Sequence, residues 1–172
     1  MPTTTQRGLT PLAATASLMF GLFALTGCSV LDTVMPKDEA VRDDKTSEVT
    51  EAGQADVFTI AVGDCFNDVD AEEISEVPVV PCDQPHDYEA YSAFDLAGDE
   101  FPGDEAVTQQ AGDGCTPPFA EFNGVSYDDS TLYLGYLLPT EDSWTQQDDR
   151  EVLCYIYEEN VQTTGTLKGA AR

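Results

Sequence analysis

Basic residues are scarce in this chain of 172 residues, which has seven Lys and Arg against 33 Asp and Glu and a net charge of −26. The imbalance excludes ordinary nucleic-acid binding, because proteins that bind phosphates present a basic surface. The single histidine, His86, excludes metal sites built from several imidazoles. The sequence also lacks a Gly-x-Ser-x-Gly nucleophile motif, a glycine-rich phosphate loop and internal repeats. Its hydrophobic fraction of 41% is nevertheless too high for a wholly disordered chain.

Acidic residues are absent from residues 1–27, which hold one base, Arg7, followed by an apolar run over residues 9–25. This pattern is typical of a secretory signal peptide. The run ends in Leu-Thr-Gly-Cys at residues 25–28, which resembles a bacterial lipobox. The resemblance implies cleavage before Cys28 and a diacylglyceryl thioether on its sulfur, which would anchor the chain to the outer face of the cell membrane. A plain signal peptide and an uncleaved helix are the alternatives, although the run is short for a membrane span.

Residues 28–56 mix charges with small polar residues and show no sustained apolar period. We expect them to form the lipidated N-terminus and a disordered acidic tether, with a coil dimension of roughly 30 Å. A short helix over residues 38–52 is the alternative. The remaining residues, 57–172, form the expected extracytoplasmic domain, with 25 acidic and three basic side chains.

The pattern within residues 57–172 predicts an α+β fold, in which a small antiparallel sheet packs against one main helix. Asp104 is expected to cap the helix, whose buried side carries Val107, Ala111 and Cys115 at four-residue spacing, and Thr116-Pro117-Pro118 is expected to break it. Alternation predicts that His86, Tyr88, Ala90, Ser92 and Phe94 share one face of a strand. The expected strands are 57–62, 77–80 (an edge strand, because of Pro78), 86–94, 131–138, 152–157 and 163–168.

Four cysteines remain in the domain after Cys28, and an exported chain can keep them oxidised. Three pairings are possible. We favour Cys65–Cys82, between neighbouring strands, and Cys115–Cys154, between the buried side of the helix and the strand at residues 152–157. Each bridge would contribute roughly 3–4 kcal/mol in the loop-entropy model. A zinc site with four thiolates is the alternative, but the sequence has no Cys-x-x-Cys pair to supply adjacent ligands.

An ordered set of short motifs covers essentially all of residues 57–172. They are Val62-Gly-Asp-Cys-Phe66, Val80-Pro-Cys82, Pro85-His86-Asp87 with Glu89, Phe101-Pro-Gly103, Pro139-Thr140 with Trp144, Arg150 with Cys154, and Thr164-Gly-Thr-Leu-Lys-Gly169. The set resembles the septum formation family domain of actinobacterial envelope proteins. The resemblance implies an extracytoplasmic domain, often attached to a membrane anchor, and a link to cell division, without catalytic residues. This chain departs from the pattern at Asp148, where a glycine is expected before Asp149-Arg150.

Two sites carry the residues best suited to chemistry or binding. His86 suits a general base or a proton switch, since imidazole titrates near neutral pH; the structural alternative is a half-buried histidine bonded to the turn after Pro85. Asp87 is adjacent in a strand and therefore points away from it. Trp144 with Arg150 could form a hot spot for a ligand or partner. The alternative is a tryptophan that caps the core while the arginine stacks on it and pairs with nearby carboxylates.

The acidic stretch at residues 67–73 offers a weak calcium site at Asp68, Asp70 and Glu72, since hard oxygen ligands suit that ion. It lacks the glycine of an EF-hand loop, and a solvated acidic loop is the alternative. We expect no cofactor. The expected function is a non-catalytic interaction or accessory module of the envelope, anchored by lipid and linked to septation. Its expected partner is an envelope or divisome protein, or a cation-decorated polymer. A calcium or small-ligand lipoprotein and an envelope hydrolase are the alternatives.

Overall fold

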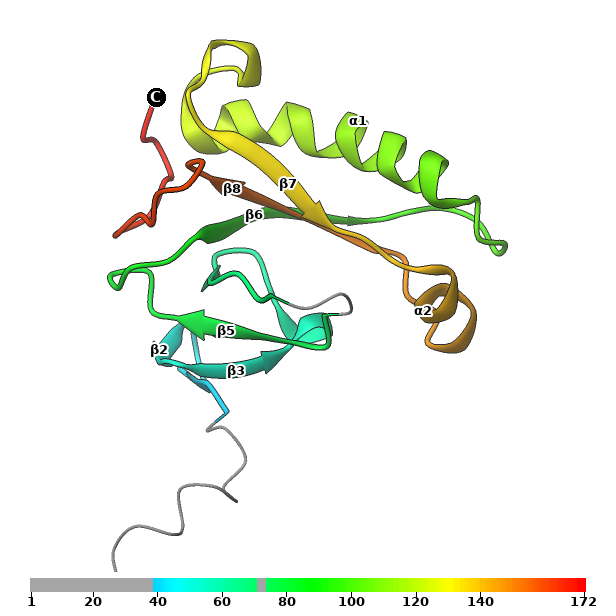
Figure 1. Cartoon of the computed structure of the whole chain (residues 1–172), viewed down its shortest axis with the longest axis horizontal. Helices are drawn as coiled ribbons and strands as arrows, with labels where there is room; N and C mark the ends of the chain where they lie inside the picture. The colour runs from blue at the N-terminus through cyan, green and yellow to red at the C-terminus, as the bar shows by residue number, and fades with distance from the viewer. Residues whose placement is uncertain (1–38, 71–73) are drawn as a thin grey trace, which may run out of the picture. The chain divides into compact units, whose positions relative to one another are not determined.

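A computed structural model describes residues 39–70 and 74–172 (Figure 1). The expected signal peptide, Cys28 and residues 28–38 of the expected tether lie outside the described residues. The elements are β1 Val41–Arg42, β2 Val49–Glu51, β3 Gly53–Asp56, β4 Cys65–Phe66, β5 Glu76–Val80, β6 Tyr88–Asp95, α1 Asp104–Asn123, β7 Tyr133–Leu137, α2 Glu141–Gln146 and β8 Glu151–Tyr157, with 3-10 turns at Val57–Thr59 and Tyr127–Asp129. Of the helices in this part of the chain, none combines the length and apolar character that a membrane crossing requires.

Six strands form one antiparallel sheet in the order β3-β5-β4-β6-β8-β7, with α1 across the β6-β8-β7 half (Figure 1). Two cores lie on opposite faces of β8. Val152, Cys154 and Ile156 join the core under α1, while Leu153 joins a second core with residues of β3, β4 and β5. Both faces of the central strands are therefore covered over part of their length. The predicted α+β architecture, with one main helix and two disulfides, is confirmed.

Helix α1 continues through Pro117 and Pro118, so the predicted break is wrong. Each proline removes one amide donor from the helix, which normally costs about 3 kcal/mol or more. Tertiary anchors on both sides of the prolines offset this cost. Cys115 is disulfide-bonded to β8, and Phe119 is fully buried in the core. The predicted burial of Val107, Ala111 and Cys115 on one side of the helix is confirmed.

The start of α1 also differs from the prediction. The residue that caps it is Gly103, which has a φ of 95° and makes no side-chain capping bond. Asp104 is instead the first residue of the helix, where its negative charge still interacts favourably with the helix dipole.

The strand predictions are correct at residues 131–138, which contain β7, and at residues 152–157, which cover all of β8 except its first residue. The strands predicted at residues 57–62 and 163–168 are not present. Residues 57–59 form a 3-10 turn, with the Asp56 carboxylate accepting a bond from the Phe58 amide, and residues 163–168 form no strand. Local apolar character predicted extended backbone in both segments, but neither finds a long pairing partner.

Strand β5 lies inside the sheet between β3 and β4, so its predicted edge position is wrong. The Pro78 carbonyl accepts a bond from the Asn67 amide, which places the imide nitrogen of Pro78 on the β4 side too. Strand β4 ends at Phe66. The nitrogen of Pro78, which has no hydrogen to donate, therefore faces the chain just after the end of β4, and the pairing of β5 with β3 is unaffected.

A bulge in β6 overturns the prediction that its alternate residues share one face. The pairing with β8 shifts between Ala90 and Ser92. Tyr88 and Ala90 consequently join the core opposite α1, whereas Phe94 packs in the core under α1. The same shift gives Tyr91 a place under the helix, where its hydroxyl donates to the Cys115 carbonyl at 2.7 Å.

The expected tether is wrong for residues 39–56, because β1, β2 and β3 form there and β3 pairs with β5 over four residues. Arg42 binds both oxygens of the Asp64 carboxylate at 2.6 and 2.7 Å, and Asp64 is 4% exposed. The Asp64 carboxylate also accepts the Ala61 amide. This bidentate pair joins residues 39–56 to the rest of the domain. The charge-rich composition of this segment gave no sign of the pairing.

Both favoured disulfides are present. Cys65–Cys82 closes a separation of 17 residues and Cys115–Cys154 one of 39. The second bridge is wholly buried at both ends, while Cys82 is half-buried. The bridges hold the two halves of the domain separately: one lies in the β4–β5 region, the other between α1 and β8.

Candidate functional site

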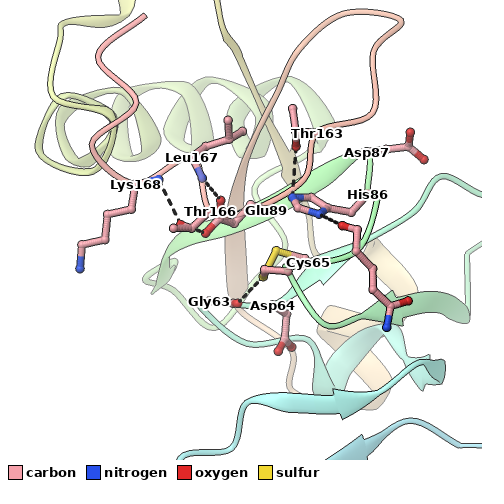
Figure 2. The surroundings of a disulfide bond; sticks show 12 residues. Gly63, Asp64, Cys65, His86, Asp87, Glu89, Thr163, Thr166, Leu167 and Lys168 are labelled. Atoms are coloured by element: carbon pink, nitrogen blue, oxygen red, sulfur yellow. Dashed lines mark hydrogen bonds between the residues drawn. A yellow bond between two sulfur atoms is a disulfide. The ribbon is translucent and has the colours of Figure 1, made fainter.

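Residues 163–169 run back along residues 82–89, and we call this segment the C-terminal latch. Figure 2 shows its contacts near the Cys65–Cys82 disulfide. The Cys82 carbonyl accepts the Gly165 amide at 2.6 Å, and His86 and Thr163 exchange two backbone bonds of 3.0 and 2.8 Å. The latch therefore joins the motif around Cys82 to the motif after Thr163, although they lie far apart in the sequence.

Glu89 holds the centre of the latch. Its side chain is 3% exposed and accepts bonds of 2.5 Å from the Thr166 hydroxyl and from the Leu167 amide (Figure 2). Bonds to an ionised acceptor are stronger than neutral ones, so these two donors compensate for burial of a carboxylate. Leu167, which follows, is buried in the core under α1.

His86 is fully buried, and both of its ring nitrogens have partners. Nδ1 lies 2.8 Å from the Gln84 carbonyl, and Nε2 lies 3.1 Å from the Thr163 hydroxyl (Figure 2). Because a carbonyl only accepts, the ring donates through Nδ1 to Gln84, and Nε2 shares a hydrogen bond with the Thr163 hydroxyl. Asp87 faces elsewhere and accepts the Asp68 amide. These contacts favour the structural interpretation of His86, with burial complete rather than partial.

Trp144 and Arg150 lie together, as the sequence suggested, and their contacts favour the structural alternative. Trp144 is 2% exposed, and its indole N–H donates to the Asp99 carbonyl at 3.1 Å. The Arg150 guanidinium lies 3.8 Å from the centre of the indole ring and donates to the carbonyls of Gly98, Trp144 and Asp149. The arginine thus closes the loop at residues 98–101 over the tryptophan.

Asp148, the departure from the family pattern, has a φ of 57°. This left-handed conformation favours glycine, and aspartate tolerates it better than most residues do. The exposed Asp148 carboxylate pairs with Arg150 at 3.1 Å. The turn therefore has a backbone conformation that glycine adopts easily, and the Asp148 side chain adds a contact to Arg150.

Within the described residues, no metal-ligand group includes the proposed calcium ligands Asp68 and Asp70. Asp68 and Asp70 are exposed, and Glu72 lies outside the described residues. The described residues contain one group with metal-ligand spacing, formed by Cys65, Cys82 and Glu89. Its two sulfurs are joined to each other and its carboxylate is bonded to the latch, so those atoms are already committed.

Sequence analysis missed a row of four aromatic residues that crosses four neighbouring strands on the face opposite α1. Tyr133 pairs with Tyr157, Tyr157 with Tyr88, and Tyr88 with Phe66. We call these four residues the aromatic row. Successive ring centres are 5.6, 5.6 and 5.3 Å apart. The row runs from Tyr133, which is 42% exposed, to Phe66, which is 2% exposed.

A neighbouring pair on the same face of the sheet, Gly135 and Tyr155, shows how the large tyrosine rings are accommodated. Gly135 pairs with Tyr155, whose ring lies over the glycine so closely that a Cβ there would meet ring atoms at 2.5 Å. Strand alternation places Tyr155 and Tyr157 on one face of β8, but the β7 residue that meets each of them is set by the strand register, which is a tertiary property. The one local signal was the alternation of Tyr155 and Tyr157 in the last strand.

Environment shifts the ionisation of these phenols. Burial, and after it the Asp68 carboxylate, raises the pKa of Tyr88 to about 12. Burial also raises the pKa of Tyr155 and of Tyr157, with contributions from Asp68 and Glu159 respectively. The hydroxyls therefore stay protonated at neutral pH and remain able to donate hydrogen bonds.

These features define the class: a small α+β domain held by two disulfides and a C-terminal latch, with an aromatic row on one sheet face. Residues 62–172 match the model of a family described as Septum formation, and the chain belongs to this family. The match includes every motif of the latch, and it associates the chain with cell division at the envelope. No curated protein and no solved structure matches the chain.

Proposed function

We propose that this protein is a lipid-anchored, extracytoplasmic accessory module that recruits a basic partner to the envelope during septum formation. The non-catalytic part of this proposal is supported by the fact that the histidine and the four cysteines of the domain already have bonding partners within the protein. His86 is buried with both ring nitrogens bonded, and the four cysteines of the domain form two disulfides. A general base or a thiol nucleophile must reach its substrate.

Two observations support export and anchoring. Disulfides persist in oxidising compartments, and both form within the domain. Cys28 follows the leader at the position where a lipobox requires it. A domain with 25 acidic and three basic side chains over residues 57–172 also favours recruitment of a cation-rich partner.

The test follows the full chain in its own cell, with Cys28→Ala as the variant. We expect the unaltered chain to incorporate radiolabelled fatty acid, to resist thiol alkylation without reductant, and to concentrate at division sites. The Cys28→Ala chain should lose the label and the membrane fraction while keeping both disulfides. An evenly distributed chain whose thiols alkylate without reductant would contradict the proposal.

Catalysis is tested separately with cell-wall preparations. We expect no loss of turbidity with the chain, and the same result with His86→Asn. Solubilisation by the unaltered chain that His86→Asn abolishes would make the protein a hydrolase.

A further inference from the structure

We propose that the exposed end of the aromatic row and the free edge of β7 together bind an extended, arginine- or lysine-rich segment of a partner protein. This inference rests on the proposed function and names the surface and the chemistry of the partner.

The edge of the sheet offers backbone hydrogen bonds. Strand β7 is the last in the order β3-β5-β4-β6-β8-β7, and within the described residues it pairs with β8 alone (Figure 1). Unpaired amides and carbonyls on an edge strand are a template for another strand. A segment added beside the five residues of β7 would place alternate side chains on the face of the aromatic row.

At the start of β7, the exposed end of the aromatic row would select a cationic side chain of the bound segment. Tyr133 begins β7 and is 42% exposed, and the Tyr157 ring lies 5.6 Å from it at an angle of 30°. Tyr133 is the exposed end of the row, and the ring surface that it presents to solvent is one on which guanidinium or ammonium groups stack favourably. The opposite edge differs, because the Ala40 amide already bonds to Gln54 of β3.

Acidic residues surround the row at the ends of its strands. Asp87 precedes Tyr88, Asp68 follows Phe66 by two residues, and Glu158-Glu159 follow Tyr157. Asp68 and Asp87 act on Tyr88, two strands in from β7, whereas Glu159 acts on Tyr157 in β8, the strand that pairs with β7. Glu158 is paired with Arg172 at 2.7 Å and Asp87 accepts the Asp68 amide, so Glu159, which follows the strand beside β7, is the carboxylate of this set best placed for a cationic partner.

Charge also decides between possible occupants of the edge. A second copy would bring another domain with the same excess of carboxylates to the same edge, and like charges oppose such pairing. A basic segment satisfies the backbone edge of β7, the exposed Tyr133 ring and the Glu159 carboxylate together. A neutral glycan could stack on tyrosine but would gain little from the carboxylates.

The experiment measures binding of the detergent-solubilised full chain to a synthetic peptide of alternating arginine and threonine, about ten residues long, which is enough to pair with β7. Its control peptide has citrulline in place of arginine. We expect the arginine peptide to bind and the citrulline peptide to bind at least about tenfold more weakly, with affinity falling as salt rises. Amide exchange over residues 133–137 should slow when the arginine peptide is present.

Three variants locate the site. Tyr133→Ala with Tyr157→Ala should weaken binding about tenfold, because it removes the ring faces. Glu159→Gln should weaken it less. Phe58→Ala is the matched control, since Phe58 is another exposed aromatic residue, at 53%, outside the row.

The outcomes separate this inference from the proposed function. Peptide binding that the double variant leaves unchanged overturns the site while leaving recruitment by charge in place. Absence of peptide binding, binding of soluble peptidoglycan fragments instead, or dimerisation through residues 133–137 also overturns the inference. Septal localisation and fatty-acid labelling, which test the proposed function, do not depend on any of these results.

Discussion

Two glycines of helix α1 should respond in opposite ways to the same substitution. A Cβ added at Gly112 has no neighbour nearer than the Tyr136 hydroxyl at 4.0 Å. A Cβ added at Gly114 would meet the Phe94 ring at 2.2, 2.5 and 2.9 Å. Both sites lie inside the helix Asp104–Asn123, so helix propensity favours alanine at each of them.

The expected magnitudes follow from these two effects. Gly112→Ala should raise the free energy of unfolding by up to about 1 kcal/mol. At Gly114 the same gain is opposed by an overpacking cost of about 1–3 kcal/mol, because the Phe94 ring must move. Gly114→Ala should therefore lie about 1–3 kcal/mol below Gly112→Ala in stability.

The assay is urea unfolding followed by fluorescence of Trp144, the single tryptophan. A double-mutant cycle with Phe94→Ala isolates the clash: in that background Gly114→Ala should become stabilising, as Gly112→Ala is. If Gly114→Ala and Gly112→Ala have equal stability in the unaltered background, Gly114 of helix α1 does not lie against the Phe94 ring of β6.

Four further results are expected. In a spectrophotometric titration of the seven tyrosines, Tyr88 should ionise near pH 12. Because folding raises the pKa of Tyr88, its contribution to stability is complete below about pH 10 and is lost as pH rises towards 12. Complete ionisation of all the tyrosines by pH 11 would contradict the buried environment of Tyr88. Arg150→Lys should lower the free energy of unfolding by about 1–2 kcal/mol and alter Trp144 fluorescence, because lysine cannot reproduce the stacked fork; an unchanged spectrum would count against the stacking. Asp148→Gly should change stability by less than about 1 kcal/mol in either direction, since relief of the positive φ opposes loss of an exposed ion pair, and a larger loss would show that the ion pair matters more. Glu89→Gln should accelerate hydrogen exchange in the C-terminal latch by about tenfold or more, because one strong acceptor is lost; unchanged exchange would mean that Glu89 does not hold the latch.

Sequence patterns predicted those features that depend on neighbouring residues. Four-residue spacing identified the buried side of α1, short apolar runs identified β7 and β8, and these together favoured the Cys115–Cys154 bridge, which is present. Helix faces and strand faces are set by local backbone geometry, so such patterns carry information about them.

Features that depend on distant partners escaped the same patterns. The bulge in β6 reverses its faces through pairing with β8, and α1 passes its prolines because Phe119 and a disulfide hold it. Arg42 binds Asp64 from a segment whose composition indicates disorder. Of the candidate sites, the neighbourhood of Trp144 and Arg150 was predictable, whereas the aromatic row required the register of four strands.

The C-terminal latch imposes an order of assembly. One ring nitrogen of His86 and one carboxylate oxygen of Glu89 find their partners 77 positions later in the chain. Until those residues arrive, a growing polypeptide contains an imidazole and a carboxylate without their final hydrogen-bond partners. If the chain crosses the membrane from its N-terminus, its first cysteine pair can oxidise early, but this end of the domain closes only after residues 163–167 have followed.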